Sequence, residues 1–201
     1  MRASNHLVHF FDDLRARVTT VSTYVAEALR RNRSVLVVAR RAHWRRVAAR
    51  LKRQATVAGP VDRKGRLVVL DADAVLSSLM RRGRLDKDLF RRTISPLVWK
   101  LAAVTPEGVA AYGEMVDILA AERNLPAVER LEESWNELMA TAPLTLLCGY
   151  DSARFTTPST QQAVGVICRA HHSVRTDAPD GLGRWLVEGA TTSSSAAPAE
   201  L

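Results

Sequence analysis

Hydrophobic positions along the chain follow two patterns, short unbroken runs and longer stretches with helical spacing. Short apolar runs indicate buried strands, which we predict at residues 7–11, 34–39, 67–70, 108–112 and 144–150. Apolar residues three or four positions apart indicate amphipathic helices, which we predict at residues 13–31, 41–53, 73–82, 86–102, 113–123, 126–140 and 160–171. Strands that alternate with helices are typical of a parallel sheet covered on both faces. We therefore predict an α/β fold with three α-β-α layers around an open, mostly parallel sheet of five or slightly more strands.

Proline and small polar residues set the expected boundaries of these elements. Pro96 is expected to divide the helix at 86–102, because proline interrupts the backbone hydrogen-bond ladder. A final strand is one interpretation of Arg184–Val187. The end of the chain is rich in Ser, Ala and Thr, which favours disorder. We predict one domain at 1–189 and a disordered tail at 190–201.

The predicted parallel sheet also indicates where a ligand would bind. In open α/β sheets, ligands lie in the crevice outside the carboxyl ends of the strands. Here those ends carry Asp12, Asp13, Ala39, Arg40, Asp71, Asp73, Tyr112, Gly113, Glu114, Tyr150 and Asp151. We expect the binding site among these residues.

Composition restricts the class of protein. Apolar residues make up 47% and charged residues 25%, which is ordinary for a globular domain. No apolar run approaches the roughly 18–20 residues of a membrane span, and the start of the chain lacks the apolar region of a secretory signal. Two cysteines make no disulfide framework. We expect a cytoplasmic protein with no membrane association.

The net charge of +8 raises nucleic-acid binding as an alternative function. The basic face would be the predicted helix at 41–53 and the residue before it, with Arg40, Arg41, Arg45, Arg46, Arg50 and Arg53. However, 25 of the 29 basic residues are Arg, which also fits GC-rich codon usage. Residues 107–137 are mostly acidic, so the charge is bipolar and suits a protein partner at least as well.

A nucleotide-hydrolysing site is not predicted. A phosphate loop needs glycines followed by Lys and Ser or Thr, whereas Asp12 and Asp13 follow the first predicted strand directly. The run Leu67–Asp71 has the shape of a Walker B strand. Many buried strands end in an aspartate that caps the next helix, and we favour that interpretation here.

Other candidate chemistry has simpler structural explanations. Cys148, Cys168 and His171 could bind a metal ion, but the chain has no CxxC motif and free cysteines commonly pack in cores. Glu114 either caps a helix, forms a buried ion pair or contacts a ligand. Glu132 could be an acid/base carboxylate or part of a solvated helix face. We predict no catalytic residue, no metal ion and no cofactor.

Several segments together resemble the MEDS domain, the sensory domain of methanogen and methylotroph regulators. The resemblance covers most of residues 5–173 and rests on HLVHFFDD, SVLVVARRAHWRRV, LVVLDADAVLSSLM, VAAYGEMVDILAAERNLPAVERLEESWNEL, LTLLCGYD and VGVICRAHH. The segment 111–138 is the most specific of these. The resemblance implies a degenerate relative of the RecA/KaiC-type ATPases without a functional phosphate loop. It also implies a ligand site built from Asp12, Asp13, Asp71, Tyr112, Glu114, Trp135 and Asn136.

The function that this resemblance implies is sensory. We expect a non-enzymatic domain that binds a small organic ligand, a regulatory protein partner, or both, in transcriptional, anti-sigma or histidine-kinase type regulation. No DNA-binding or kinase segment is recognised in the sequence, so the signal is expected to pass to a separate partner. A homo-oligomer is left open as a further partner. The alternatives are nucleic-acid binding through the 40–53 helix and a residual nucleotide- or metal-dependent enzyme.

Overall fold

The computed structural model of the protein describes residues 5–54, 65–155 and 158–177. Its main sheet has the strand order β3-β2-β6-β7-β1-β8, and every pairing within it is parallel. The strands are β1 (His6–Phe11), β2 (Ser34–Ala39), β3 (Leu67–Asp71), β6 (Val109–Gly113), β7 (Leu144–Asp151) and β8 (Ser173–Thr176). A separate antiparallel hairpin joins β4 (Met80–Arg81) to β5 (Arg84–Leu85).

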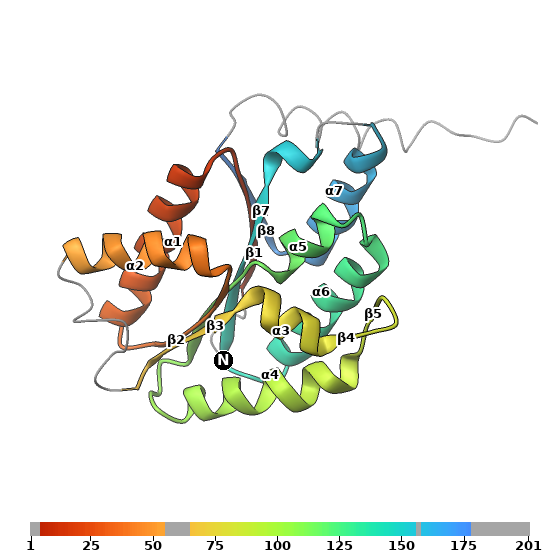
Figure 1. Ribbon diagram of the computed structural model, residues 1–201. Coiled ribbons are helices and arrows are strands. Elements are labelled where there is room, and N and C mark those ends of the chain that lie inside the picture. The colour runs from red at the N-terminus through yellow and green to blue at the C-terminus, as the bar shows by residue number, and fades with distance from the viewer. Residues whose placement is uncertain (1–4, 55–64, 156–157, 178–201) are drawn as a thin grey trace, which may run out of the picture.

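Helices cover both faces of the sheet (Figure 1). One face carries α1 (Leu14–Arg30) and α2 (Arg41–Arg53). The other face carries α3 (Ala72–Leu79), α4 (Lys87–Ala102), α5 (Met115–Ala121), α6 (Leu125–Met139) and α7 (Pro158–Ala170), with a short 3-10 helix, η1 (Ser152–Phe155), after β7. The predicted three-layer α/β fold is confirmed. Within the described ranges, no helix is both long enough and apolar enough to span a membrane.

One hydrophobic core lies on each face of the sheet, because successive strand residues point to opposite faces. In β2, Val35 and Val37 pack with α1 and α2, whereas Leu36 and Val38 pack with the helices of the other face. All six residues of β2 are buried. Burying a large apolar side chain stabilises the fold by roughly 1.5–3 kcal/mol. The apolar run of β2 therefore suits an inner strand that helices cover on both faces.

Aspartates fix the starts of three helices. The Asp13 carboxylate accepts the N–H of Ala16 at 2.7 Å at the start of α1. The Asp71 carboxylate accepts the N–H groups of Asp73 and Ala74 at the start of α3, and Asp86 caps α4 in the same way. The cap interpretation of Asp71 is therefore confirmed, and the caps at Asp13 and Asp71 lie where the chain passes from a strand of the main sheet to a helix.

Most predicted bounds are within one or two residues of the structure, and three larger differences stand out. The helix α4 continues through Pro96, because Phe90, Ile94 and Val98 form one buried stripe whose packing outweighs the roughly 3 kcal/mol that an interior proline costs. The predicted helix at 73–82 stops at Leu79, where the β4–β5 hairpin begins. The strand β8 adds a sixth strand that the sequence patterns did not reveal, whereas Arg184–Val187 and the predicted tail lie outside the described residues.

Candidate functional site

A cleft of about 340 Å³ opens at the carboxyl ends of β1, β2 and β7. It is lined by Phe11, Asp12, Asp13, Leu14, Arg17, Arg40, His43, Asp117, Asp151 and Arg154. These residues come from strand ends, from the first turn of α1, from the starts of α2 and α5 and from η1, which the parallel sheet places at one edge. The cleft therefore lies where ligands bind in other open α/β sheets.

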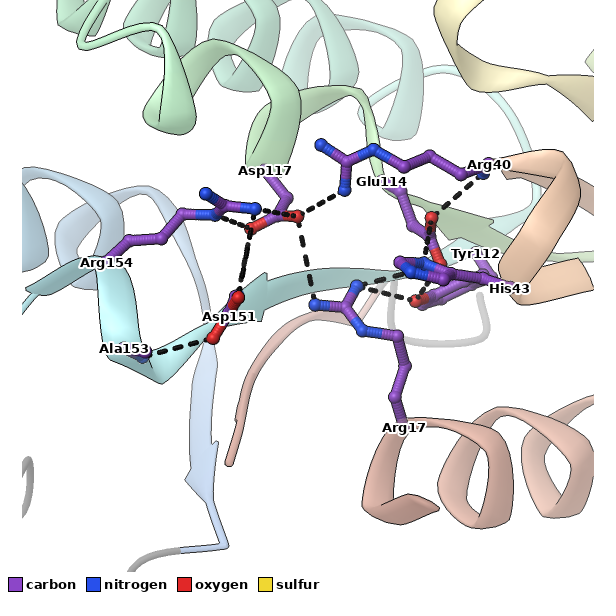
Figure 2. A network of polar contacts seen from close by, with 9 residues as sticks. All are labelled: Arg17, Arg40, His43, Tyr112, Glu114, Asp117, Asp151, Ala153 and Arg154. Atoms are coloured by element: carbon purple, nitrogen blue, oxygen red, sulfur yellow. Dashed lines mark hydrogen bonds and ion pairs between the residues drawn. The ribbon is translucent and has the colours of Figure 1, made fainter. Parts of the chain in front are cut away.

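Glu114 forms the first half of a polar network beside this cleft (Figure 2). Its side chain is 1% exposed. Its Oε1 accepts the Tyr112 hydroxyl at 2.8 Å, and its Oε2 accepts the backbone N–H of Arg40 at 2.9 Å and Nδ1 of His43 at 2.8 Å. Burial acts to raise the pKa of Glu114, but the His43 hydrogen bond and the Arg17 charge hold it below its usual value.

The environment of Glu114 decides between its predicted roles. The residue occupies the N-cap position of α5, yet its side chain makes no capping hydrogen bond. The carboxylate instead lies 3.6 Å from Nη1 of Arg17, itself a buried residue. The capping interpretation is therefore wrong and the buried ion pair is confirmed, because the strand end directs this carboxylate inward to the network and away from the helix terminus.

Asp117 forms the second half of the network, from the first turn of α5 (Figure 2). Its side chain is 1% exposed and lies 2.6 Å from Nη1 of Arg40 and 2.8 Å from Nε of Arg154. It also accepts the backbone N–H of Asp151 at 2.9 Å, and Nη2 of Arg17 lies 3.9 Å away. Burial acts to raise the pKa of Asp117, but these cations hold it below its usual value.

Arg17 and Tyr112 connect the two carboxylates. Nη1 of Arg17 donates to the Tyr112 hydroxyl at 3.3 Å, and its guanidinium lies 4.9 Å from the centre of the Phe11 ring. Burial and the neighbouring Glu114 raise the pKa of Tyr112 well above its usual value, so its hydroxyl stays protonated and donates. A Cβ at Gly149 would lie 2.7 Å from the Tyr112 hydroxyl, so only glycine at this position in β7 leaves room for the tyrosine.

The chemistry available in the cleft is hydrogen bonding by groups of both charges. Arg40 and Arg154 have side chains 23% and 28% exposed, and each uses only part of its five-donor guanidinium on Asp117. Asp12 and Asp13 are exposed at the cleft and can accept hydrogen bonds. Such a site can hold a small molecule that carries both acceptors and donors.

The structure separates the seven residues that the family resemblance placed in one ligand site. Asp12 and Asp13 line the cleft, and Tyr112 and Glu114 belong to the network beside it. Asp71 lies at the end of β3, where it caps α3 and pairs with Arg41. The other two, Trp135 and Asn136, lie on α6 across the sheet. Ligand contact by any of these residues stays a prediction.

A second polar cluster lies on that opposite face, between the sheet and helices α6 and α7. It contains His6, Glu132, Cys148 and His171, which each place one potential ligand atom within 4.8 Å of all the others. Asn136 contacts His6 at 2.8 Å, whereas Trp135 packs edge-to-face on Phe90 in the core. Of the three cysteine and histidine residues proposed from sequence as metal ligands, Cys148 and His171 belong to this cluster and Cys168 does not.

Sequence reasoning missed half of the cleft network. Arg17, His43 and Arg154 sit in polar stretches that give no sign of burial. Asp117 did carry a signal, because it interrupts the apolar run Met115–Leu119 and a charge there requires partners. The predicted nucleic-acid face keeps fewer free cations than the sequence indicated. Arg40 pairs with Asp117 and Arg41 pairs with Asp71. The exposed arginines on this face include Arg45, Arg46 and Arg53.

Comparison with known proteins identifies the family of this chain. No curated protein matches the chain. A family model does match residues 5–166, most of the chain, and its description is MEDS, the MEthanogen/methylotroph, DcmR Sensory domain. The match includes the strand ends and the helices that supply the cleft network as far as Arg154. The chain therefore belongs to the MEDS family of sensory domains.

Proposed function

We propose that the protein is a non-enzymatic sensory domain that binds a small polar organic molecule in the cleft and signals to a regulatory protein partner. One observation carries this proposal: the cleft opens onto a buried network of arginines and carboxylates at the carboxyl ends of the parallel strands. Perturbed carboxylates in a cleft mark candidate functional sites. Family membership supports the sensory role.

The start of α1 argues against a nucleotide as the ligand. A helix N-terminus after a strand would bind phosphate through free backbone N–H groups. Here the Asp13 carboxylate already accepts the N–H of Ala16, and Asp12 lines the same cleft. Two carboxylates would repel phosphate at short range. This local structure supports a ligand other than ATP and fits a relative of the RecA/KaiC-type ATPases without nucleotide hydrolysis.

The network also provides a way to convert binding into a structural signal. Asp117 on α5 is held by Arg40, which precedes α2, and by Arg154 in η1. A hydrogen-bond acceptor on the ligand would compete with Asp117 for the guanidinium of Arg40 or Arg154. The ion pairs that fix α5 would then weaken. A ligand shifts such an equilibrium only by its difference in affinity for the two arrangements. The expected response is a change in the position of α5 and in the surface offered to a partner.

Native mass spectrometry of the full chain tests the proposal. The purified protein is measured first, and then with alcohols, amines and carboxylic acids of one to six carbons. Arg154→Gln removes a cleft donor, and Arg91→Gln is the matched control because Arg91 is an exposed residue on α4. We expect a bound small molecule in the wild type and in Arg91→Gln that Arg154→Gln binds at least tenfold more weakly. Equal binding by all three proteins, or none by the wild type, would refute the assignment.

A further inference from the structure

The buried cluster of His6, Glu132, Cys148 and His171 has the composition of a transition-metal site. It joins the start of β1, the middle of β7, the helix α6 and the residue after α7. The side chains of both histidines are 0% exposed, that of Glu132 is 2% exposed, and Cys148 is fully buried. Imidazole, thiolate and carboxylate are the ligand types that bind Zn²⁺.

The spacing of the donor atoms suits one tetrahedral ion. Nε2 of His6 lies 3.4 Å from Sγ of Cys148 and 3.3 Å from Oε2 of Glu132. Sγ of Cys148 lies 3.6 Å from the same carboxylate oxygen, and Nε2 of His171 lies 3.5 Å from Oε1. Bonds of about 2.0–2.3 Å at tetrahedral angles separate ligand atoms by roughly 3.3–3.7 Å. The three distances among Nε2 of His6, Sγ of Cys148 and Oε2 of Glu132 therefore match one face of such a tetrahedron, and Nε2 of His171 lies beside the other oxygen of the same carboxylate, within 4.8 Å of the other ligand atoms.

Hydrogen bonds outside the cluster orient its ligands toward a common centre. Nδ1 of His6 faces the side-chain oxygen of Asn136 at 2.8 Å, and the Asn136 amide is fixed because its nitrogen donates to the Ala170 carbonyl at 3.0 Å. Nδ1 of His171 faces the Ile167 carbonyl at 2.6 Å. Both acceptors require a proton on Nδ1, which leaves the Nε2 lone pairs directed inward. Metal-bound histidines are usually held in this way.

Glu132 is held in the same manner. The Tyr150 hydroxyl donates to its Oε1 at 2.8 Å, which leaves Oε2 to face His6 and Cys148. Among the residues that the structure describes, none forms a hydrogen bond with the buried Nε2 of His171, and Oε1 of Glu132 lies 3.5 Å from it. An inward lone pair without a donor is costly in a protein core. A metal ion is the group that would satisfy it.

We propose that His6, Glu132, Cys148 and His171 bind one Zn²⁺-class ion that fixes α6 and α7 to the sheet. A thiolate and a carboxylate balance the charge of a dication, which makes its burial favourable. Four protein ligands fill a tetrahedral shell, so the site is structural and has no open position for substrate. The ion enters as the chain folds, since the cluster is closed to solvent.

Metal titration of the full chain without an affinity tag tests this assignment. Elemental analysis is expected to find one Zn²⁺ per chain after refolding with zinc. Co²⁺ is expected to give the thiolate charge-transfer absorption and the intense visible bands of a tetrahedral site. No bound metal and no such absorption in the wild type would overturn the proposal, and this result needs no variant to fold.

Three variants then test which residues bind the metal ion and which residue orients a ligand. Cys148→Ser is expected to lose the Co²⁺–thiolate absorption and to weaken Zn²⁺ binding at least tenfold. Cys168→Ser is the matched control because Cys168 lies outside the cluster, and it is expected to behave like the wild type. Asn136→Ala is expected to weaken Zn²⁺ binding by about 10–100-fold with the absorption preserved. Loss of the absorption in Cys168→Ser with its retention in Cys148→Ser would place the metal elsewhere and overturn the assignment.

Discussion

Replacing Asp117 by asparagine is the sharpest test of the cleft network. The substitution keeps the shape of the side chain and removes its charge. The side chain is 1% exposed and is paired with Arg40 and Arg154. Removing one partner of a buried ion pair typically costs about 3–5 kcal/mol, because the remaining charge is left buried. We therefore expect Asp117→Asn to lower the free energy of unfolding substantially.

The surroundings place this loss near the lower end of that range. The side chains of Arg40 and Arg154 are 23% and 28% exposed and can regain water. Arg17 is the cation that stays buried, and it still has Glu114 at 3.6 Å. The asparagine oxygen can also still accept the backbone N–H of Asp151. We expect a loss of about 3 kcal/mol.

Urea unfolding at pH 7, followed by circular dichroism, measures this loss. The matched control is Asp88→Asn, which breaks an exposed pair with Arg91 in which the two side chains are 65% and 62% exposed. Such a pair is worth about 0–1 kcal/mol, so the control is expected to change little. A loss below about 1 kcal/mol for Asp117→Asn, similar to the control, would show that the network contributes no more than a surface pair and would refute the reasoning.

Three further measurements test the buried carboxylates, the packing around Gly149 and the charged face of α2. The pKa values of Glu114 and Asp117 lie below the ordinary 4.5 and 3.8. The two carboxylates therefore stabilise the fold above those ordinary values, and this stabilisation is lost as the pH falls through their lowered pKa values. Urea midpoints measured from pH 7 to about 3 should fall for the wild type and fall less for Asp117→Asn. Gly149→Ala should destabilise the protein by about 1–3 kcal/mol in the same urea assay, because overpacking costs about that much. Gly165→Ala is the control, since a Cβ at Gly165 meets only an arginine side-chain nitrogen at 3.4 Å, and a loss of stability for Gly149→Ala no larger than that of the control would contradict the close packing. Fluorescence anisotropy should detect no duplex DNA binding at about 50 mM salt, and an affinity that falls steeply toward about 200 mM would instead support a nucleic-acid role for α2.

Much of the fold was predictable because its strands are buried on both faces. The predicted bounds of β2 and α2 agree with the structure, since a run of Ser and branched apolar residues is followed at once by helical spacing. The β4–β5 hairpin was missed because each strand has two residues, too few for any alternation. Its turn depends on positive φ angles at Arg82 and Gly83, and the first is not a residue that signals such a turn.

Site residues were predictable from the sequence only where they directly follow a predicted strand. Asp12 and Asp13 follow a strand, so the edge of a parallel sheet fixes their place at the cleft. His6 and Glu132 belong to segments more than 120 residues apart, and each alone has an ordinary explanation as a strand or helix residue. Their meeting depends on the parallel pairing of β1 with β7 and on the side of α6 that packs against the sheet. The spacing of these residues along the sequence does not indicate that they lie side by side in the fold.

The helix pair α5–α6 is held at two different places, which explains why the segment 111–138 carries so many specific polar residues. Asp117 fixes α5 to the cleft network, whereas Glu132 and Asn136 fix α6 to the buried cluster. The two helices meet at a tight turn where Arg123 has a φ of 55°. A ligand that loosens Asp117 would therefore move α5 against an α6 held by its own cluster. The backbone of the turn between the two helices would have to change conformation to allow that displacement. The structural change proposed for ligand binding would therefore be expected at this turn.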